Sequence, residues 1–362
     1  MVIVEKGNMI NGMKEKRKID RREFIKEVSF TGLGVAVGAS LISKSERKLL
    51  AQDASRIVIA NHPEAVTGIR LNQEIVQKIV DAGIMQYTGQ KTVADAWASV
   101  LPSLSAKDIV TIKVNCINSS LSTHPEFVDA IVTGLVSAGV TENNIIIWDR
   151  TNHELISAGY KYNIGNTGVR CFGTNEKGWG YDKQVKLSNQ NVRLSKILMN
   201  TTHLINAPVL KDHGTSGITI SMKNHYGSVD NPENLHGGEC DPYIAELNNV
   251  PDIKTKTRII VLDALLGIFR GGPIAPPQFV YNSVIFGQDP VALDYTGWTI
   301  LRDERQKNGQ NLPLPRQIKT ANKLGLGTSD PKNIIVEKIN VKDEFAVIPS
   351  GKKVTTWGAR KL

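Results

Sequence analysis

Apolar and polar positions alternate along the middle of the chain in a pattern that predicts strands and helices in turn. Residues 108–115 and 144–149 are short apolar runs, as expected of buried strands. Between them, residues 125–139 place Phe127 and Leu135 on one face of a predicted helix. Together the three segments predict a βαβ unit, in which a helix joins two parallel strands.

Both of these strands are followed by a signal for the start of a helix. Thr123 and Glu126 have the spacing of a capping box, and so do Thr151 and Glu154. We therefore expect threonine N-caps, and helices that begin directly after the two strands.

The alternation continues toward the C-terminus and predicts the fold class. Further strands are expected at 203–210, 257–263 and 280–286, with helices at 215–226, 242–248 and 290–306. This order predicts an α/β fold, with a mostly parallel sheet, helices on both faces and Rossmann-like layering. Residues 173–192 and 228–241 are rich in Gly and Asn and are expected to be loops. The chain beyond Leu312 is expected to be peripheral.

The N-terminal 51 residues are predicted to be an export signal and linker. The heptapeptide 20–26, D-R-R-E-F-I-K, precedes an apolar run at 28–42 and resembles a twin-arginine (Tat) signal. The run has about fifteen residues, fewer than the roughly 20 that span a bilayer, so no permanent membrane span is expected. The alternative is a basic amphipathic helix, which the glycines in the run disfavour. The resemblance implies export through the Tat machinery to the periplasm, or another extracytoplasmic compartment, of a protein that is already folded.

The net charge, the aromatic content and the cysteine spacing argue against some classes of partner and cofactor. The formal net charge is +9, and residues 1–50 supply more than half of it, with eleven Lys and Arg against six Asp and Glu. Only 6% of residues are aromatic, so no nucleic-acid surface is predicted. Cys116, Cys171 and Cys240 lie far apart without a Cys-x-x-Cys motif. No iron–sulfur cluster and no disulfide scaffold are therefore expected.

Polar residues gather where the predicted strands end. The carboxyl ends of parallel strands meet at one edge of a sheet, where α/β proteins bind ligands. Lys113 is the least easily explained as structural, because it lies between Ile112 and Val114 in an apolar strand and must snorkel, pair with a carboxylate or hold an anion. The strand-end residues are Lys113, Asn115, Asp149, Arg150, Lys211, Asp212, His213, Asp263 and Asp289.

One stretch, residues 206–227, is especially dense in groups that can bind anions or move protons. If the chain after Gly217 is helical, its first turn offers free N–H groups to an anion. Lysine charges and histidine pKa values near neutrality suit anion binding and proton transfer. The candidate catalytic residues are Lys113, Lys211, His213, Lys223, Asn224 and His236.

A divalent metal is a second hypothesis for the same region. The spacings between His213, His225 and His236 match no short ligand signature, so a metal would need ligands from separate segments. The candidate ligands are His213, His236, Asp149 and Asp263. No glycine motif for dinucleotides, no P-loop and no serine-hydrolase elbow occurs in the sequence, which disfavours those three classes.

Several blocks of sequence, in this order, resemble the family known as domain of unknown function 362 (DUF362). They include V-T-I-K-V-N, T-H-P-E-F-V, I-N-A-P-V-L-K-D-H, S-M-K-N-H-Y-G and G-Q-D-P-V-A-L-D. The resemblance divides the chain into the signal at 1–51, an α/β domain at 52–340 with its core at 108–300, and a peripheral tail at 341–362. It implies that some relatives carry ferredoxin-type cysteine clusters, which the three cysteines here cannot form. It supplies no catalytic residues.

Two functions follow from these residues. The first is an exported enzyme that acts on a small anionic substrate with lysine and histidine acid–base chemistry, with or without a metal. The second is a periplasmic binding or maturation protein that holds a metal or cofactor without turnover. The sequence does not separate the two.

Overall fold

The structure is a computed structural model that describes residues 2–3, 18–19 and 54–342. The chain divides into two compact units, Met1–Asp53 and Ala54–Leu362. In the first unit, β1 (Val2–Ile3) pairs antiparallel with β2 (Lys18–Ile19). The predicted twin-arginine motif and the apolar run lie outside the described residues. Among the described residues, no helix is both long and apolar enough to cross a membrane.

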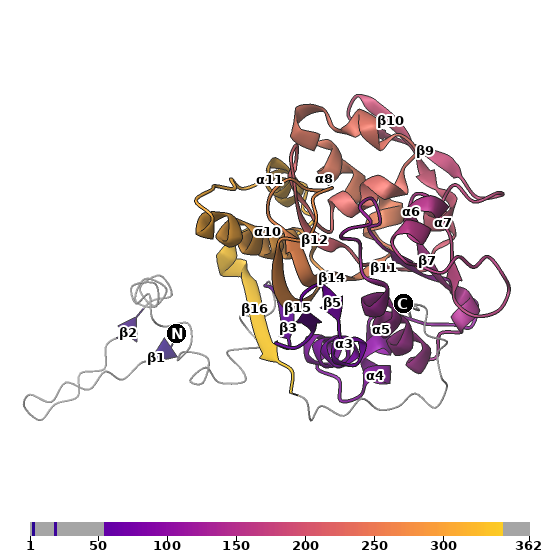
Figure 1. Cartoon of the computed structure of the whole chain (residues 1–362). Coiled ribbons are helices and arrows are strands. Elements are labelled where there is room, and N and C mark those ends of the chain that lie inside the picture. Colours follow the sequence, from indigo (N-terminus) through magenta and orange to yellow (C-terminus); the bar gives the residue numbers. More distant parts are fainter. Residues whose placement is uncertain (1, 4–17, 20–53, 343–362) are drawn as a thin grey trace, which may run out of the picture. The chain divides into compact units, whose positions relative to one another are not determined.

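The second unit is built on a ten-stranded sheet (Figure 1). Its main path runs in the order β16-β3-β15-β14-β11-β6-β7-β8, with β12 paired to β14 and β13 to β12. The strands are β3 (Ser55–Asn61), β6 (Val110–Lys113), β7 (Ile145–Trp148), β8 (Arg170–Cys171), β11 (His203–Asn206), β12 (Val209–His213), β13 (Gly217–Thr219), β14 (Thr257–Ile268), β15 (Phe279–Gly287) and β16 (Ile334–Asn340).

Most strand pairs are parallel, which confirms the predicted fold class. The strands from β14 through β11, β6 and β7 to β8 all run in the same direction. Antiparallel pairing occurs on both sides of β15 and within the β12–β13 hairpin. The predicted βαβ unit is present as β6, α5 and β7.

Helices cover both faces of the sheet. They are α3 (Gln73–Thr88), α4 (Val93–Ser99), α5 (Pro125–Ser137), α6 (Asn152–Ser157), α7 (Lys196–Asn200), α8 (Tyr243–Asn248), α9 (Pro251–Lys254), α10 (Pro290–Lys307) and α11 (Arg316–Lys323). Along β7, Ile145 and Ile147 belong to the core beneath α3, α4 and α5, whereas Ile146 and Trp148 belong to the core that α8, α10 and α11 cover. This alternation is the period of two expected of a strand buried on both faces.

One of the two predicted helix caps is wrong. Thr151 is the N-cap of α6, as predicted. The N-cap of α5 is His124, which makes no side-chain cap bond. The hydroxyl of Thr123 instead donates to the carbonyl of Ala207 and accepts from the backbone N–H of Asn115. The Thr123 side chain therefore bonds to the backbone at the ends of two neighbouring strands instead of capping the helix.

The predicted helix at 215–226 is also wrong. Gly217, with φ of +82°, begins strand β13, which folds back antiparallel on β12. A 3-10 helix, η3 (Lys223–Ser228), follows after a short turn. The β-branched run at 218–220 favours the extended backbone, and pairing with β12 supplies its hydrogen bonds. No helix N-terminus is therefore available to an anion after Gly217.

Other segments contain more regular structure than the sequence predicted. The strand expected at 203–210 is two strands, β11 and β12, separated at Ala207 and Pro208. The loop expected at 173–192 contains most of a hairpin of β9 (Tyr181–Leu187) and β10 (Gln190–Ser195). Part of the loop expected at 228–241 forms the 3-10 helices η4 (Pro232–Leu235) and η5 (Gly237–Cys240).

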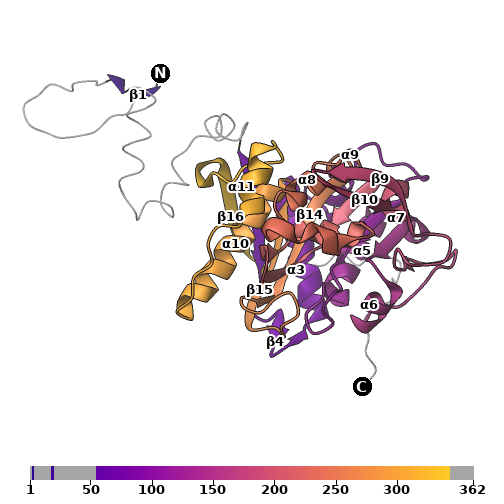
Figure 2. The same cartoon turned by 90° about the horizontal axis from the view of Figure 1, so that it is seen from above.

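Residues 313–342, which were expected to be peripheral, are part of the fold. Helix α11 packs on α8 and α10, and β16 pairs in parallel with the whole of β3. Figure 2 shows α10, α11 and β16 at one end of the unit and the β9–β10 hairpin with α7 at the other. The last strand in sequence thus forms one edge of the central sheet.

Candidate functional site

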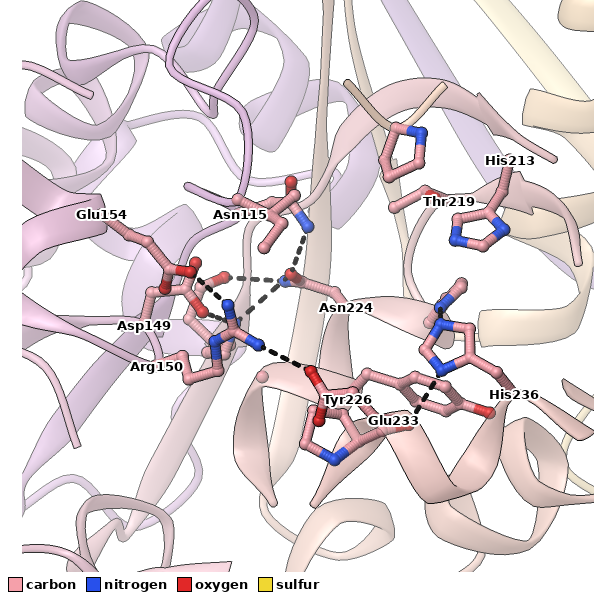
Figure 3. A pocket seen from close by; sticks show the side chains of 16 residues that line it. Asn115, Asp149, Arg150, Glu154, His213, Thr219, Asn224, Tyr226, Glu233 and His236 are labelled. Carbon is pink, nitrogen blue, oxygen red and sulfur yellow. Dashed lines mark hydrogen bonds and ion pairs between the residues drawn. The ribbon is translucent and has the colours of Figure 1, made fainter. Parts of the chain in front are cut away.

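A cavity of about 230 Å³ lies where β6, β7 and β12 reach their carboxyl ends, at the edge of the sheet that the sequence predicted (Figure 3). The loops after β6 and β7, α6, β13, residues 223–236 and Pro273 supply the rest of its wall. Its lining residues are Lys113, Asn115, Ile117, Asp149, Arg150, Glu154, His213, Thr219, Lys223, Asn224, Tyr226, Gly227, Pro232, Glu233, His236 and Pro273.

A buried ion pair forms the floor between β6 and β7. Lys113 is fully buried, and its Nζ donates to Oδ1 of Asp149 at 2.6 Å and to the carbonyl of Val114 at 2.7 Å. The other carboxylate oxygen of Asp149 accepts from the backbone N–H of Cys116 at 2.7 Å. Asp149 therefore neutralises the lysine that the sequence singled out, and Lys113 brings no uncompensated charge to the cavity.

Two asparagines connect the floor to the rest of the wall. Nδ2 of Asn224 donates to the carbonyl of Lys113 at 3.1 Å and to Oδ1 of Asn206 at 2.8 Å. Nδ2 of Asn115 donates to Oδ1 of Asn224 at 3.3 Å. The carbonyl oxygen of Asn115 in turn accepts from Lys211 Nζ at 2.9 Å. Lys211 is fully buried behind Asn115 and does not line the cavity, and burial lowers its pKa to about 7.

Lys223 and His236 face each other on the opposite side of the cavity. His236 Nδ1 lies 3.0 Å from the carbonyl of Pro232, so it must carry the proton that donates there. Its Nε2 is then a lone-pair acceptor, 3.3 Å from Lys223 Nζ. The ammonium also lies 4.0 Å from the centre of the Tyr226 ring, a cation–π distance. Burial lowers the pKa of Lys223 to about 8.

His213 stacks beside His236, with ring centroids 5.8 Å apart. Its Nδ1 accepts from the backbone N–H groups of Thr215 and Ser216, at 3.0 and 3.2 Å. The neutral ring must therefore carry its proton on Nε2. Burial, followed by the charge of Lys223, lowers the pKa of His213 to about 3, so the ring is neutral near pH 7. The same two causes lower the pKa of His236.

Arg150 and two glutamates occupy the side of the cavity next to Asp149. Arg150 forms ion pairs with Glu154, four residues along α6, and with Glu233 of η4. The side chain of Glu233 is 75% exposed, so this pair lies at the rim. Figure 3 shows Arg150 and Glu154 on one side of Asn224 and the two histidines on the other. The cavity thus has a side with paired charges and a side with histidines and a lysine.

The structure places the remaining strand-end aspartates outside the cavity wall. Asp263 accepts from His124 Nδ1 at 2.7 Å. Burial lowers the pKa of His124, but the charge and hydrogen bond of Asp263 outweigh that effect and raise it. Asp212 is paired with Arg305, and Asp289 caps α10.

The donor set does not fit the predicted metal site. Within residues 54–342, no three His, Cys, Asp or Glu side chains are grouped so that they can hold a metal ion. Asp263 is bonded to His124, and Asp149 to Lys113. His236 directs its free nitrogen at the Lys223 ammonium, a position where a metal cation would meet another positive charge.

Several residues of the wall were not singled out from the sequence, among them Thr219, Tyr226 and Glu233. Tyr226 and Thr219 lie in the segment that was predicted as a helix, and Glu233 lies in a predicted loop. The Tyr226 hydroxyl donates to the carbonyl of Leu235 at 2.6 Å, which holds the ring beneath Lys223. Thr219 and Tyr226 could have been found from the sequence, because they lie four residues before and three residues after the candidate Lys223.

Comparisons with known proteins give a family and remote structural neighbours. The family model described as "Domain of unknown function (DUF362)" matches residues 110–299. No curated protein matches the chain significantly. Among solved structures, the lactate racemase apoprotein from Thermoanaerobacterium thermosaccharolyticum aligns with a TM-score of 0.35 and 15% identity. The alignment covers 70% of this chain and 58% of that protein, which is less than two thirds of its length.

Proposed function

The chain belongs to the family defined by the domain of unknown function DUF362, and we propose that it is an enzyme that acts on a small anionic substrate by lysine and histidine acid–base chemistry. The family name supplies no activity, so the proposal rests on the cavity. A volume of about 230 Å³ suits a small metabolite, since cavities for drug-sized ligands measure about 300–1,000 Å³.

One observation carries the proposal: Lys223 is a buried cation in the cavity wall without a carboxylate partner. It is 7% exposed, and it forms no ion pair with any described residue. The other lysine and the arginine of the wall, Lys113 and Arg150, are both paired with carboxylates. A buried ammonium without a counter-ion is unfavourable, and an anionic ligand would relieve this cost.

The two histidines beside Lys223 have complementary roles in the proposed chemistry. Nε2 of His236 accepts a proton, because Pro232 fixes the proton of this ring on Nδ1. Nε2 of His213 donates a hydrogen bond or a proton, because two backbone N–H groups occupy its Nδ1. An acceptor and a donor on neighbouring rings can remove a proton from one substrate atom and supply one to another. We assign Lys113, Lys211 and Asn224 as positioning residues, because their polar groups are already hydrogen-bonded to other protein groups.

A screen for turnover tests this proposal. The purified protein is incubated with separate small carboxylates and phosphate monoesters in D2O, and proton NMR follows both exchange and product formation. We expect more than one product or exchanged molecule per protein chain with at least one compound. The His236→Gln variant should lose at least about 100-fold in rate, the usual contribution of an acid–base group.

The matched control is His153→Gln, which changes an exposed histidine on α6 away from the cavity. It should keep the activity of the unchanged protein. Saturable binding without turnover would contradict the enzyme and favour a binding or maturation protein. Full activity in His236→Gln would contradict the role given to His236.

A further inference from the structure

The side chain of Thr219 has an unsatisfied hydroxyl at the cavity. Thr219 is 4% exposed and belongs to the wall, yet its Oγ1 is buried without a hydrogen-bond partner among the described residues. Buried hydroxyl groups in proteins nearly always have a partner, and leaving one without a partner destabilises the fold. A ligand held in the cavity would supply a partner for this hydroxyl, and so would a water molecule.

The register of the β12–β13 hairpin brings this hydroxyl to the same face as His213. Lys211 lies opposite Thr219, and His213 lies opposite Gly217. Side chains at alternate positions of a strand share a face, and so do directly opposed residues of antiparallel strands. His213 and Thr219 therefore project together from one face of the hairpin. Figure 3 shows Thr219 next to His213.

We propose that Thr219, His213 and Lys223 form the carboxylate subsite of the ligand, with Thr219 as a specificity-determining residue. This proposal rests on the proposed function and names the substrate class. The three side chains supply a hydroxyl, an imidazole N–H and an ammonium, and all three belong to one cavity wall. A carboxylate has two oxygens with about four lone-pair positions, so it can accept from all three donors.

Charge favours a carboxylate over a phosphate. Lys223 is the one wall cation, among the described residues, that no carboxylate pairs. His213 donates as a neutral ring, so the three donors together carry one positive charge. A carboxylate carries one negative charge and balances it, whereas a phosphate monoester near pH 7 carries nearly two.

Binding of acetate and of inorganic phosphate tests the subsite without any need for turnover. NMR of the full-length protein, with carbon-13 in the lysine ε-methylene groups, measures each dissociation constant from the shift of the Lys223 signal. We expect acetate to bind more tightly than phosphate. Thr219→Val, which replaces the hydroxyl by a methyl group, should weaken acetate binding about tenfold, as for loss of a hydrogen bond to a charged group.

Thr215→Val is the matched control, since the Thr215 side chain is exposed at the tip of the same hairpin and the change keeps the backbone N–H that donates to His213. It should bind acetate like the unchanged protein, and circular dichroism should show both variants folded. Equal affinity of Thr219→Val and Thr215→Val would overturn the role of Thr219, and tighter binding of phosphate would overturn the carboxylate assignment. If acetate binding depends on Thr219 but no substrate turns over, the subsite stands and the enzyme proposal fails. If turnover depends on His236 but Thr219→Val leaves acetate binding unchanged, the enzyme proposal stands and the subsite fails.

Discussion

Lys223 carries the charge on which ligand binding depends, in surroundings that disfavour charge. Burial lowers its pKa to about 8, so the ammonium predominates at pH 7 and disappears as the pH rises above 8. His213, with a pKa of about 3, stays neutral across this range. We therefore predict that acetate affinity is nearly constant between pH 6 and 7 and falls about tenfold per pH unit well above 8.

Titrations with acetate at fixed ionic strength, from pH 6 to pH 10, measure this dependence. Lys223→Arg supplies the comparison, because a guanidinium keeps its charge throughout the range. Any acetate affinity that this variant retains should show no decline above pH 8. A decline of the same size in both proteins would mean that another group controls binding.

At the scale of elements, η3 packs closely against the β6–β7 ion pair, and the residue at the contact is a glycine. A Cβ atom on Gly227 would lie 2.6 Å from Oδ1 of Asp149 and 2.8 Å from Nζ of Lys113. Both atoms are buried and already bonded to each other, so neither can move without breaking their pair. We predict that Gly227→Ala lowers the free energy of unfolding by about 1–3 kcal/mol, as overpacking usually does.

Urea denaturation measures this loss, with Gly214→Ala as the control. Gly214 lies in the β12–β13 turn, and a Cβ atom there would have nothing within 4 Å. Its replacement should change stability little. A Gly227→Ala protein as stable as the control would show that η3 can shift away from the ion pair.

The elements that local pattern determines were predicted well. The apolar strand–helix–strand segment around β6, α5 and β7 has ends within two residues of the prediction, because its apolar spacing matches its burial. Strand β13 was not predicted, because its hydrogen bonds come from β12 rather than from its own sequence. Strand β16 was missed for a different reason: it is an edge strand, and its apolar residues Ile334, Ile335 and Val336 are consecutive and exposed or half-exposed instead of alternating with polar ones.

The candidate site was predicted in part for the same reason. Lys113, Asp149 and His213 were found because they end strands or directly follow them, and parallel strands bring their carboxyl ends together. The pairing of Lys113 with Asp149 was left open by the sequence, because it depends on which strand neighbours β6. Asp263 was expected nearby but bonds to His124 instead, because the residues of one strand alternate between the two faces of the sheet.

At the scale of the whole molecule, the strand that follows the proposed leader, β3, is not a neighbour in the sheet of the strands that carry the site. Strand β3 starts at Ser55 and is separated from β6 by β15, β14 and β11. The strands that carry Lys113, Asp149 and His213 are β6, β7 and β12. The fold therefore builds its site without using the first strand of the unit, and a removable leader before that strand is compatible with it.

Export by the twin-arginine route remains a proposal that this arrangement permits, and it leads to a prediction. The motif at 20–26 contains the arginine pair on which a twin-arginine signal depends. Replacing Arg21 and Arg22 together by lysine keeps the charge of the leader and removes the motif. We expect the doubly changed protein to stay in the cytoplasm with its leader uncleaved, whereas a Lys44→Arg control is exported. Immunoblots of cytoplasmic and periplasmic fractions measure both location and leader length. Equal export of the two proteins would show that export does not depend on the arginine pair, and retention of both in the cytoplasm would favour the amphipathic helix.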